Sequence, residues 1–480
     1  MAKVKFLLTI AATTLISACS VGPDYVKPTA DVPAEFKESD PWKVAQPLDD
    51  VDRGAWWRIF NDSRLNELEE QVAVSNQNLI AAEANFRQAK ILVRAARSGY
   101  FPQVDAGASV TRARSASKSS AGSGNISTNF LLSAEASWEL DIWGRVRRSV
   151  EASLSGAQAS AADLESLRLS AQAELALNYF QLQTVDAQKQ MFEATVSSFQ
   201  QLLDLTKSRY DEGVVSRTDV LMAETQLRTT QVQAMDLGVQ RAQLEHAIAL
   251  LIGKSPAQFS LQPVPRDIIP PRIPSSLPSE LLERRPDIAA AERRVAEANA
   301  KIGIAKAAYF PSITLSSTAG FAASSFSNWL TWPNRVWSLG TALAQTVFDG
   351  GLRSAQVDEA QAVYDATVAT YRETVLTGFQ EVEDNLATLR ILEEETMIQD
   401  QAVKASQQAF EITANQYQVG TVAYLNVLVA QTAVLANERT ALALAGRRLT
   451  ASVLLVKALG GGWRQDKQGE VSYNGMTAIK

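Results

Sequence analysis

The sequence predicts a mainly α-helical chain that contains two copies of one helix–hairpin–helix repeat and contributes four strands to a membrane β-barrel. Three observations predict this fold class. Motifs recur at an offset of 207 to 209 residues, which indicates an internal duplication. Two segments of each copy alternate apolar and polar residues, as half-buried strands do. Each copy also contains a very long helical segment with almost no glycine or proline.

The composition excludes several classes of protein. The chain has 480 residues, a formal net charge of −6, one histidine and one cysteine. This charge argues against a nucleic-acid binder. His246 and Cys19 are too few to form a metal cluster, and a Ser-His-Asp triad would depend on His246 alone. We interpret His246 as an ordinary helix residue. We therefore expect no enzyme activity, no cofactor, no metal and no nucleic-acid partner.

Residues 1–18 have the pattern of a secretory signal peptide. Lys3 and Lys5 precede an apolar stretch of about 13 residues, which is too short to span a membrane as a helix. The stretch ends at Ile16-Ser17-Ala18-Cys19, which resembles a bacterial lipobox. This resemblance implies that the Cys19 thiol carries lipid in the outer membrane, and the alternative is an unmodified cysteine after an ordinary signal peptide. We expect residues 19–61 to form a lipid-anchored N-terminal segment.

The two copies contain similar motifs in the same order. Tyr309-Phe310-Pro311 repeats Tyr100-Phe101-Pro102, and Gly420 repeats Gly213 within a similar stretch. Closely spaced prolines between the copies predict an extended linker. The expected segments are the first repeat over 62–260, the linker over 261–278, the second repeat over 279–462 and a C-terminal tail over 463–480.

Each repeat is expected to begin with a helix and continue with a pair of strands. In the first copy, apolar residues recur at helical spacing from Asp62 to Gly99, and Pro102 stops the helix. The expected strands cover about 103–113, 129–142, 312–322 and 337–348. One face of these strands is apolar, so the opposite face would line a wet, acidic lumen. The acidic residues expected on that lumen face are Asp105, Glu135, Glu139 and Asp141.

A long helical hairpin is expected after each pair of strands. The hairpins cover about 149–253 and 352–460, and each turns at a glycine, Gly213 in the first and Gly420 in the second. Leucines from Leu428 to Leu449 recur at steps of seven residues, which is typical of helices that pack side by side. Such hairpins cannot bury their apolar stripes alone.

The strand pattern predicts an assembly of several chains. Strands of about ten residues match those that cross an outer membrane, and lipid tolerates strands only in a closed sheet. The smallest membrane barrels have about eight strands, so this chain with four cannot close one alone. The residues leave barrels of 8, 12 or 16 strands open. A soluble β-ribbon is the alternative for these segments.

The stretch from Leu277 to Glu292, which contains Arg284-Arg285-Pro286-Asp287, resembles the signature of TolC-like outer-membrane efflux channels in their OprM-type lipoprotein branch. Trp138 to Arg145 and Phe348 to Gly351 match further stretches of that family. The resemblance covers nearly the whole mature chain. It implies a homotrimer with a 12-stranded β-barrel in outer-membrane lipid, continued by a 12-helix periplasmic α-barrel. The implied function is a passive exit duct for small toxic compounds or drugs in a tripartite efflux system of the resistance-nodulation-division type.

The resemblance also implies partners and site residues. The partners are a periplasmic membrane-fusion adaptor and an inner-membrane pump, which we expect to be proton-driven. Adaptor docking is expected at the hairpin tips, at Gly213, Val214, Gly420 and Thr421. Relatives often carry aspartates at the narrowest point of the tunnel, whereas this chain has Asn426 and Val429 there and Asp219 in the first copy. We therefore expect a weaker cation preference than in relatives with two acidic rings.

Two other functions remain open at this stage. The duct could secrete proteins rather than small compounds, because the tunnel sequence does not distinguish the two cargoes. A lipid-anchored periplasmic coiled-coil scaffold would also use long helices, although it would not need two amphipathic hairpins. Arg284, Arg285 and Asp287 are interpreted as structural residues that pair near a helix start.

Overall fold

The structure is a computed structural model that describes residues 21–30, 36–37, 55–114, 126–263 and 285–461. Cys19, the signal peptide, the tail 463–480 and most of the linker 261–278 lie outside these residues. The chain divides into two compact units, and each is described by itself. The first unit comprises residues 1–29, 85–161 and 290–372, and the second comprises 30–84, 162–289 and 373–480. In the described part of the chain, no helix is both long enough and apolar enough to span a bilayer.

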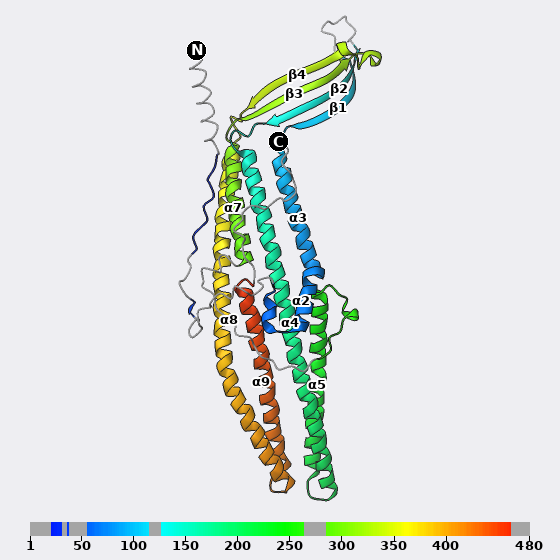
Figure 1. Cartoon of the computed structure of the whole chain (residues 1–480), viewed down its shortest axis with the longest axis vertical. Coiled ribbons are helices and arrows are strands. Elements are labelled where there is room, and N and C mark those ends of the chain that lie inside the picture. The colour runs from blue at the N-terminus through cyan, green and yellow to red at the C-terminus, as the bar shows by residue number, and fades with distance from the viewer. Residues whose placement is uncertain (1–20, 31–35, 38–54, 115–125, 264–284, 462–480) are drawn as a thin grey trace. The chain divides into compact units, whose positions relative to one another are not determined.

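The first unit contains a four-stranded antiparallel sheet in the order β1-β2-β3-β4 (Figure 1). The strands are β1 (Gln103–Arg114), β2 (Ile126–Glu139), β3 (Ser312–Ala323) and β4 (Arg335–Ala344). The two copies of the repeat contribute one strand pair each, and β2 joins β3 at the centre. As a result β1 and β4 are the edge strands of the described sheet.

Two of the expected strand ranges need correction at their ends. The second strand ends at Glu139 instead of reaching residue 142, and the fourth ends at Ala344 instead of 348. In both places an aspartate starts a helix after the strand. Asp141 accepts hydrogen bonds from the backbone N–H groups of Val146 and Arg147. Asp349 accepts from Gly351 and Arg353 in the same manner. Asp141 serves as a cap and so does not take part in the ladder, and Asp349 caps the helix directly after the expected end of the fourth strand.

Helices α4 (Arg145–Asp211) and α8 (Leu352–Gln418) follow the strand pairs, and each has 67 residues. At 1.5 Å per residue each is about 100 Å long. The first starts at Arg145 rather than near residue 149, directly after the positive φ of Gly144. Each of the two helices contributes residues to both units. Helix α7 (Pro286–Ala307) lies before β3 in the chain, as α3 (Gln77–Ser98) lies before β1.

The second unit is built from helices. It contains η2 (Trp56–Phe60), α2 (Ser63–Ser75), α5 (Arg217–Leu251), η3 (Pro256–Gln258), α9 (Tyr424–Ala458) and the adjoining parts of α4 and α8. Two short 3₁₀ turns, η4 (Phe326–Asn328) and η5 (Trp332–Asn334), belong instead to the first unit and connect β3 to β4.

The expected single helix from Asp62 to Gly99 is divided in the structure at Asn76. The backbone of Asn76 is extended, with φ −67° and ψ 120°. Its Oδ1 accepts hydrogen bonds from the N–H groups of Asn78 and Leu79, which caps α3, and its Nδ2 donates to the carbonyl of Leu251. Helical periodicity continues across this residue, so apolar spacing alone could not indicate the break.

Candidate functional site

The sheet has two chemically different faces, and the strand register determines them. On one face, Val104 and Ala106 of β1 lie beside Ala136 and Ala134 of β2. The further apolar residues of this face are Phe130, Leu132, Trp138, Ile313, Leu315, Ala319, Phe321, Trp337, Leu339 and Leu343. The fourth strand thus aligns its large apolar residues with those of β3. Trp337 and Leu339 are 78% and 77% exposed, so this face is uncovered in the single chain.

The opposite face consists mainly of small polar residues and carboxylates. Asp105 of β1 lies directly opposite Glu135 of β2, and Thr318 and Ser338 continue the same row. Like charges in directly opposed positions repel each other, and water between them reduces the repulsion. Two of the expected lumen residues are therefore neighbours on one polar face.

The other two expected lumen residues lie at the end of β2. Glu139 is the last strand residue, and the Arg145 guanidinium donates to both of its carboxylate oxygens at 2.6 and 3.0 Å. Asp141 lies beyond the strand and caps α4. Hydrogen bonding to Glu139 is the largest cause of the raised pKa of Arg145. These two carboxylates connect a strand to a helix, a role that the sequence pattern did not predict.

The two hairpin turns of the second unit have the same geometry. Gly213 and Gly420 have φ values of +78° and +81°. The next residues, Val214 and Thr421, donate their N–H groups to carbonyls five residues earlier, at 2.8 and 2.9 Å. This is the Schellman pattern that ends a helix with glycine in the left-handed region. Val214 is 65% exposed, and no atom lies within 4 Å of a Cβ added to either glycine. Both turns are open surfaces.

An apolar cluster beside these turns packs the two hairpins against each other. It is formed by Phe199, Leu203, Ala223, Leu227, Tyr417, Tyr424 and Val427. Arg209 joins the hairpins through polar contacts, because its guanidinium donates to the carbonyls of Tyr417 and Gln418 at 2.8 and 2.7 Å. It also lies 4.6 Å from the centre of the Tyr417 ring. Burial raises the pKa of Tyr424 to about 12, so this phenol stays neutral.

Sequence reasoning did not single out Arg209, although the comparison of the two copies contains a signal. The equivalent position in the second copy is Gln416, so the two turns differ there in charge. A cation near the C-terminus of one hairpin arm can bind the last carbonyls of the other arm. The difference between the copies at this position is thus the signal in the sequence that indicates a special contact of Arg209.

The three gate candidates lie on the return helices of the hairpins. Asp219 belongs to a capping box at the start of α5, where its Oδ2 accepts from the N–H and the hydroxyl of Ser216 at 3.0 and 2.8 Å. Asn426 and Val429 are both exposed on α9, and Val429 is 62% exposed. A separation of three residues places them on one face of that helix. The acidic candidate is therefore engaged locally, and the other two are neutral.

A groove of about 710 Å³ lies on the second unit, across α4, α5, α8 and α9. Its polar lining is mostly amides and hydroxyls, and Arg447 is the charged residue among its lining residues. The amide residues are Gln181, Gln188, Gln240, Gln243 and Asn385. Among the described residues, no group of three or more histidines, cysteines or carboxylates could hold a metal ion.

Comparison with known proteins identifies the family. The family model described as outer membrane efflux protein matches residues 68–254 and 277–461, one match for each repeat. The probable efflux pump outer membrane protein TtgC of Pseudomonas putida is 31% identical, with 96% of each chain covered. The pyoverdine export outer membrane protein OpmQ of Pseudomonas aeruginosa is 30% identical and covers 97% of this chain and 98% of its own.

A solved structure of the outer-membrane channel OprN superimposes with a TM-score of 0.87 at 31% identity. The match covers 93% of this chain and all of that one. With both repeats matched and the fold shared, the chain belongs to the outer membrane efflux protein family.

Proposed function

We propose that three copies of this chain form the outer-membrane exit duct of a tripartite efflux system for small toxic compounds or drugs. As a family member the chain lies in the outer membrane and extends into the periplasm. The observation that carries the proposal is the sheet with one apolar face and edge strands β1 and β4. Lipid accepts such a sheet only when its edges are closed.

Closure by copies of the same chain follows from the number of strands. Four strands are too few for a membrane barrel, so β4 of one copy must pair with β1 of the next. Three copies give twelve strands, with the apolar face toward lipid and the row of Asp105, Glu135, Thr318 and Ser338 toward water. The chain acts as a passive duct, and an inner-membrane pump, proton-driven in this proposal, supplies the energy.

Conductance tests this proposal directly. The purified protein, reconstituted in planar bilayers, is expected to conduct ions as a trimer. Deletion of the gene is expected to increase the sensitivity of the cells to drugs and solvents, and re-expression is expected to restore resistance. A stable monomer that does not conduct would contradict the proposal. Unchanged drug sensitivity together with the loss of a secreted protein would assign the duct to protein export.

The adaptor is proposed to bind the hairpin turns at Gly213, Val214, Gly420 and Thr421. These turns are exposed, and neither Val214 nor Thr421 belongs to the apolar cluster between the hairpins. Val214→Arg is expected to weaken crosslinking to the adaptor in cells. The matched control is Val232→Arg, because Val232 is also 65% exposed and lies within α5. Equal loss of crosslinking in both variants would contradict docking at the turns.

The narrowest point is proposed to lie near Asp219, Asn426 and Val429. The carboxylate of Asp219 is held by Ser216, and the other two side chains are neutral. A weak cation preference is therefore expected from single-channel reversal potentials in a salt gradient. Val429→Asp is expected to increase that preference, and a strong preference in the unmodified channel would contradict the proposed lining.

Lipid is proposed to attach to Cys19. Mass spectrometry of the N-terminal peptide of the mature protein is the direct test, with diacylglycerol on sulfur and an acylated amino group as the expected result.

A further inference from the structure

The first nine described residues of the chain, 21–29, run along the first unit as an extended segment that we name the N-terminal strap. Its backbone carbonyls are bound at both ends. The Asn299 side chain of α7 donates to the carbonyl of Pro23 at 3.0 Å. The Arg372 Nε of α8 donates to the carbonyl of Thr29 at 3.4 Å. Contacts to backbone atoms hold the strap in one register.

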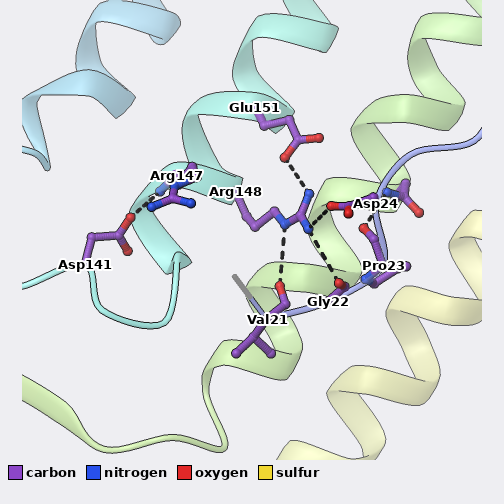
Figure 2. A network of polar contacts seen from close by, with 9 residues as sticks. Val21, Gly22, Pro23, Asp24, Asp141, Arg147, Arg148 and Glu151 are labelled. Atoms are coloured by element: carbon purple, nitrogen blue, oxygen red, sulfur yellow. Dashed lines mark hydrogen bonds and ion pairs between the residues drawn. The ribbon is translucent and has the colours of Figure 1, made fainter. Parts of the chain in front are cut away.

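Arg148 of α4 makes the densest set of contacts with the strap (Figure 2). Its Nε donates to the carbonyl of Val21 at 3.4 Å, and its Nη2 donates to the carbonyl of Gly22 at 3.5 Å and to Asp24 at 2.9 Å. Its Nη1 donates to Glu151 on the same helix at 2.8 Å. The Arg148 side chain is 5% exposed. Without the strap, this guanidinium would keep Glu151 as a carboxylate partner but would lose Asp24 and the two strap carbonyls.

The strap side of the contact is equally specific. Gly22 has φ +102°, and a Cβ on it would lie 2.5 Å from the Cα of Gly303 in α7. A Cβ on Gly303 would lie 2.9 Å from the Cγ of Arg148. Two glycines thus let the strap, α7 and the Arg148 side chain approach closely. Further along, Glu292 accepts a hydrogen bond from the Tyr25 hydroxyl at 3.3 Å and pairs with Lys27 at 3.0 Å.

The start of the strap lies beside the residues that precede α4 and β3. The Val21 N–H donates to the carbonyl of Trp143 at 3.2 Å. The Trp143 ring stacks on Phe310 at 4.8 Å, and its Nε1 donates to the carbonyl of Pro311, one residue before β3. Docking at Arg148 therefore places residue 21 where β3 begins.

We propose that Arg148 is the positioning residue of a socket that binds residues 21–24 and fixes where the N-terminus leaves the protein. The socket joins the two repeats, because residues 21–24 contact α4 of the first and α7 of the second. Cys19 precedes Val21 by two residues, so the docked strap fixes the point at which the acyl chains enter the membrane. This last step rests on the proposed lipid attachment, whereas docking itself does not.

Hydrogen exchange of the full-length purified protein, measured by mass spectrometry, tests the socket. In the unmodified protein the Val21 amide is expected to exchange slowly, because its N–H is hydrogen-bonded to the carbonyl of Trp143. Arg148→Ala is expected to speed exchange of the Val21 amide roughly tenfold or more, because several hydrogen bonds that hold the strap in place are lost together. The matched control is Arg147→Ala, because Arg147 is exposed and adjacent in sequence. Arg148→Lys, which can replace one contact, is expected to recover part of the protection.

A second variant approaches the same contact from the strap. Gly22→Ala leaves the side chains of α4 and α7 intact and is expected to release the strap to a similar extent. If Arg148→Ala also speeds exchange in β2 and α5, the substitution destabilises the whole protein. In that case Gly22→Ala is the variant that decides whether the strap is bound at the socket. Limited digestion with chymotrypsin is expected to cut after Tyr25 in both variants and to spare the Arg147→Ala control. Unchanged protection in Gly22→Ala would overturn the proposal. Neither readout depends on conductance, so loss of the socket and loss of the proposed duct are distinguishable.

Discussion

Buried charges in the second unit differ in how they are neutralised. Arg285 bonds Asp287 at 2.7 Å and Glu381 at 2.6 Å, and it also donates to the carbonyl of Ala458. Arg285 and Asp287 thus pair at the start of α7, as expected, and Arg284 lies outside the described residues. Glu69, by contrast, is fully buried in α2, and neither of its carboxylate oxygens has a hydrogen-bond partner among the described residues.

Glu69→Gln is expected to stabilise the protein at neutral pH. Burial raises the pKa of Glu69 well above its ordinary value, so the folded state keeps a proton that the unfolded chain releases. Because the folded pKa is the higher one, its favourable contribution is complete below the unfolded pKa of about 4.3. It is lost by about 1.4 kcal/mol per pH unit above that value, up to the folded pKa.

Thermal unfolding of the purified protein at pH 4 and pH 7.5 measures this effect. The variant is expected to unfold at a higher temperature at pH 7.5 and at the same temperature as the unmodified protein at pH 4. Glu70→Gln is the matched control, because Glu70 is the adjacent residue and is exposed. A midpoint that the Glu69 substitution leaves unchanged at pH 7.5 would show that the carboxylate is solvated.

Gly253→Ala is expected to destabilise the second unit by about 2–4 kcal/mol. Gly253 has φ +68°, and an added Cβ would lie 2.2 Å from the carbonyl oxygen of Ser75, which is backbone and cannot move aside. Gly238→Ala is the control, because no atom lies within 4 Å of its added Cβ and it is inside α5. That control is expected to gain about 1 kcal/mol. Chemical denaturation that ranks the two variants equally would contradict this.

At the scale of helices, the two hairpins differ in how their return arms begin. Helix α5 starts with a complete capping box in which Ser216 and Asp219 each accept from the other's backbone N–H. Helix α9 starts after Ala423, which has the same extended backbone, with φ −76° and ψ 155°, but no side chain that can cap. The second hairpin therefore has the weaker start.

The caps predict opposite effects of two small substitutions. Ser216→Ala is expected to cost about 1 kcal/mol, and Ala423→Ser is expected to gain about 0.5–1 kcal/mol. Both residues are exposed and lie at equivalent places in the two copies, so each serves as the control for the other. Hydrogen exchange of the first turns of α5 and α9 is the most local measurement. A loss of protection in the Ala423→Ser variant would contradict the argument.

The sequence predicted the elements better than their ends. Alternation and glycine turns indicated four strands and two hairpins, because side-chain period and positive φ are local properties. The sequence does not indicate the break at Asn76, because the Asn76 amide also donates to the carbonyl of Leu251, far away in sequence. Asp141 was assigned to a strand because alternation continues into the cap. The partners of Arg148 and Arg209 depend on tertiary contacts that one sequence does not contain.

At the scale of the whole molecule, the sheet determines how the chain meets the membrane. The aromatic residues between β3 and β4 gather beside it, since Phe130 lies 5.8 Å from Phe326 and 5.7 Å from Trp329. Arg335 lies over the Trp332 ring at 4.0 Å. Aromatic rings with nearby cations are typical of the boundary between lipid and water. Insertion and trimer formation should therefore depend on the apolar face of the strands.

Leu339→Arg is expected to prevent insertion of the trimer, and Ser338→Arg is expected to be tolerated. The two residues are neighbours in β4 and lie on opposite faces of the sheet. Arginine on a lipid-facing strand position costs about 2–4 kcal/mol at the bilayer midplane, and this cost recurs in each copy. The yield of heat-modifiable trimer in outer-membrane fractions is the measurement. Equal yields from the two variants would mean that the assignment of the faces is reversed.

The tandem duplication has a consequence for how this channel can change over time. In a ring of three chains, the six hairpin ends alternate between two types, one with Arg209 and a capped return arm and one with Gln416 and an uncapped arm. A mutation in one of the two hairpin ends alters three of the six ends in the ring and leaves the other three unchanged. A partner with threefold symmetry could bind hairpin ends of a single type. Six identical partner proteins would instead need two binding modes. Divergence of the copies therefore gives the ring an alternating surface on which one mode can evolve while the other is preserved.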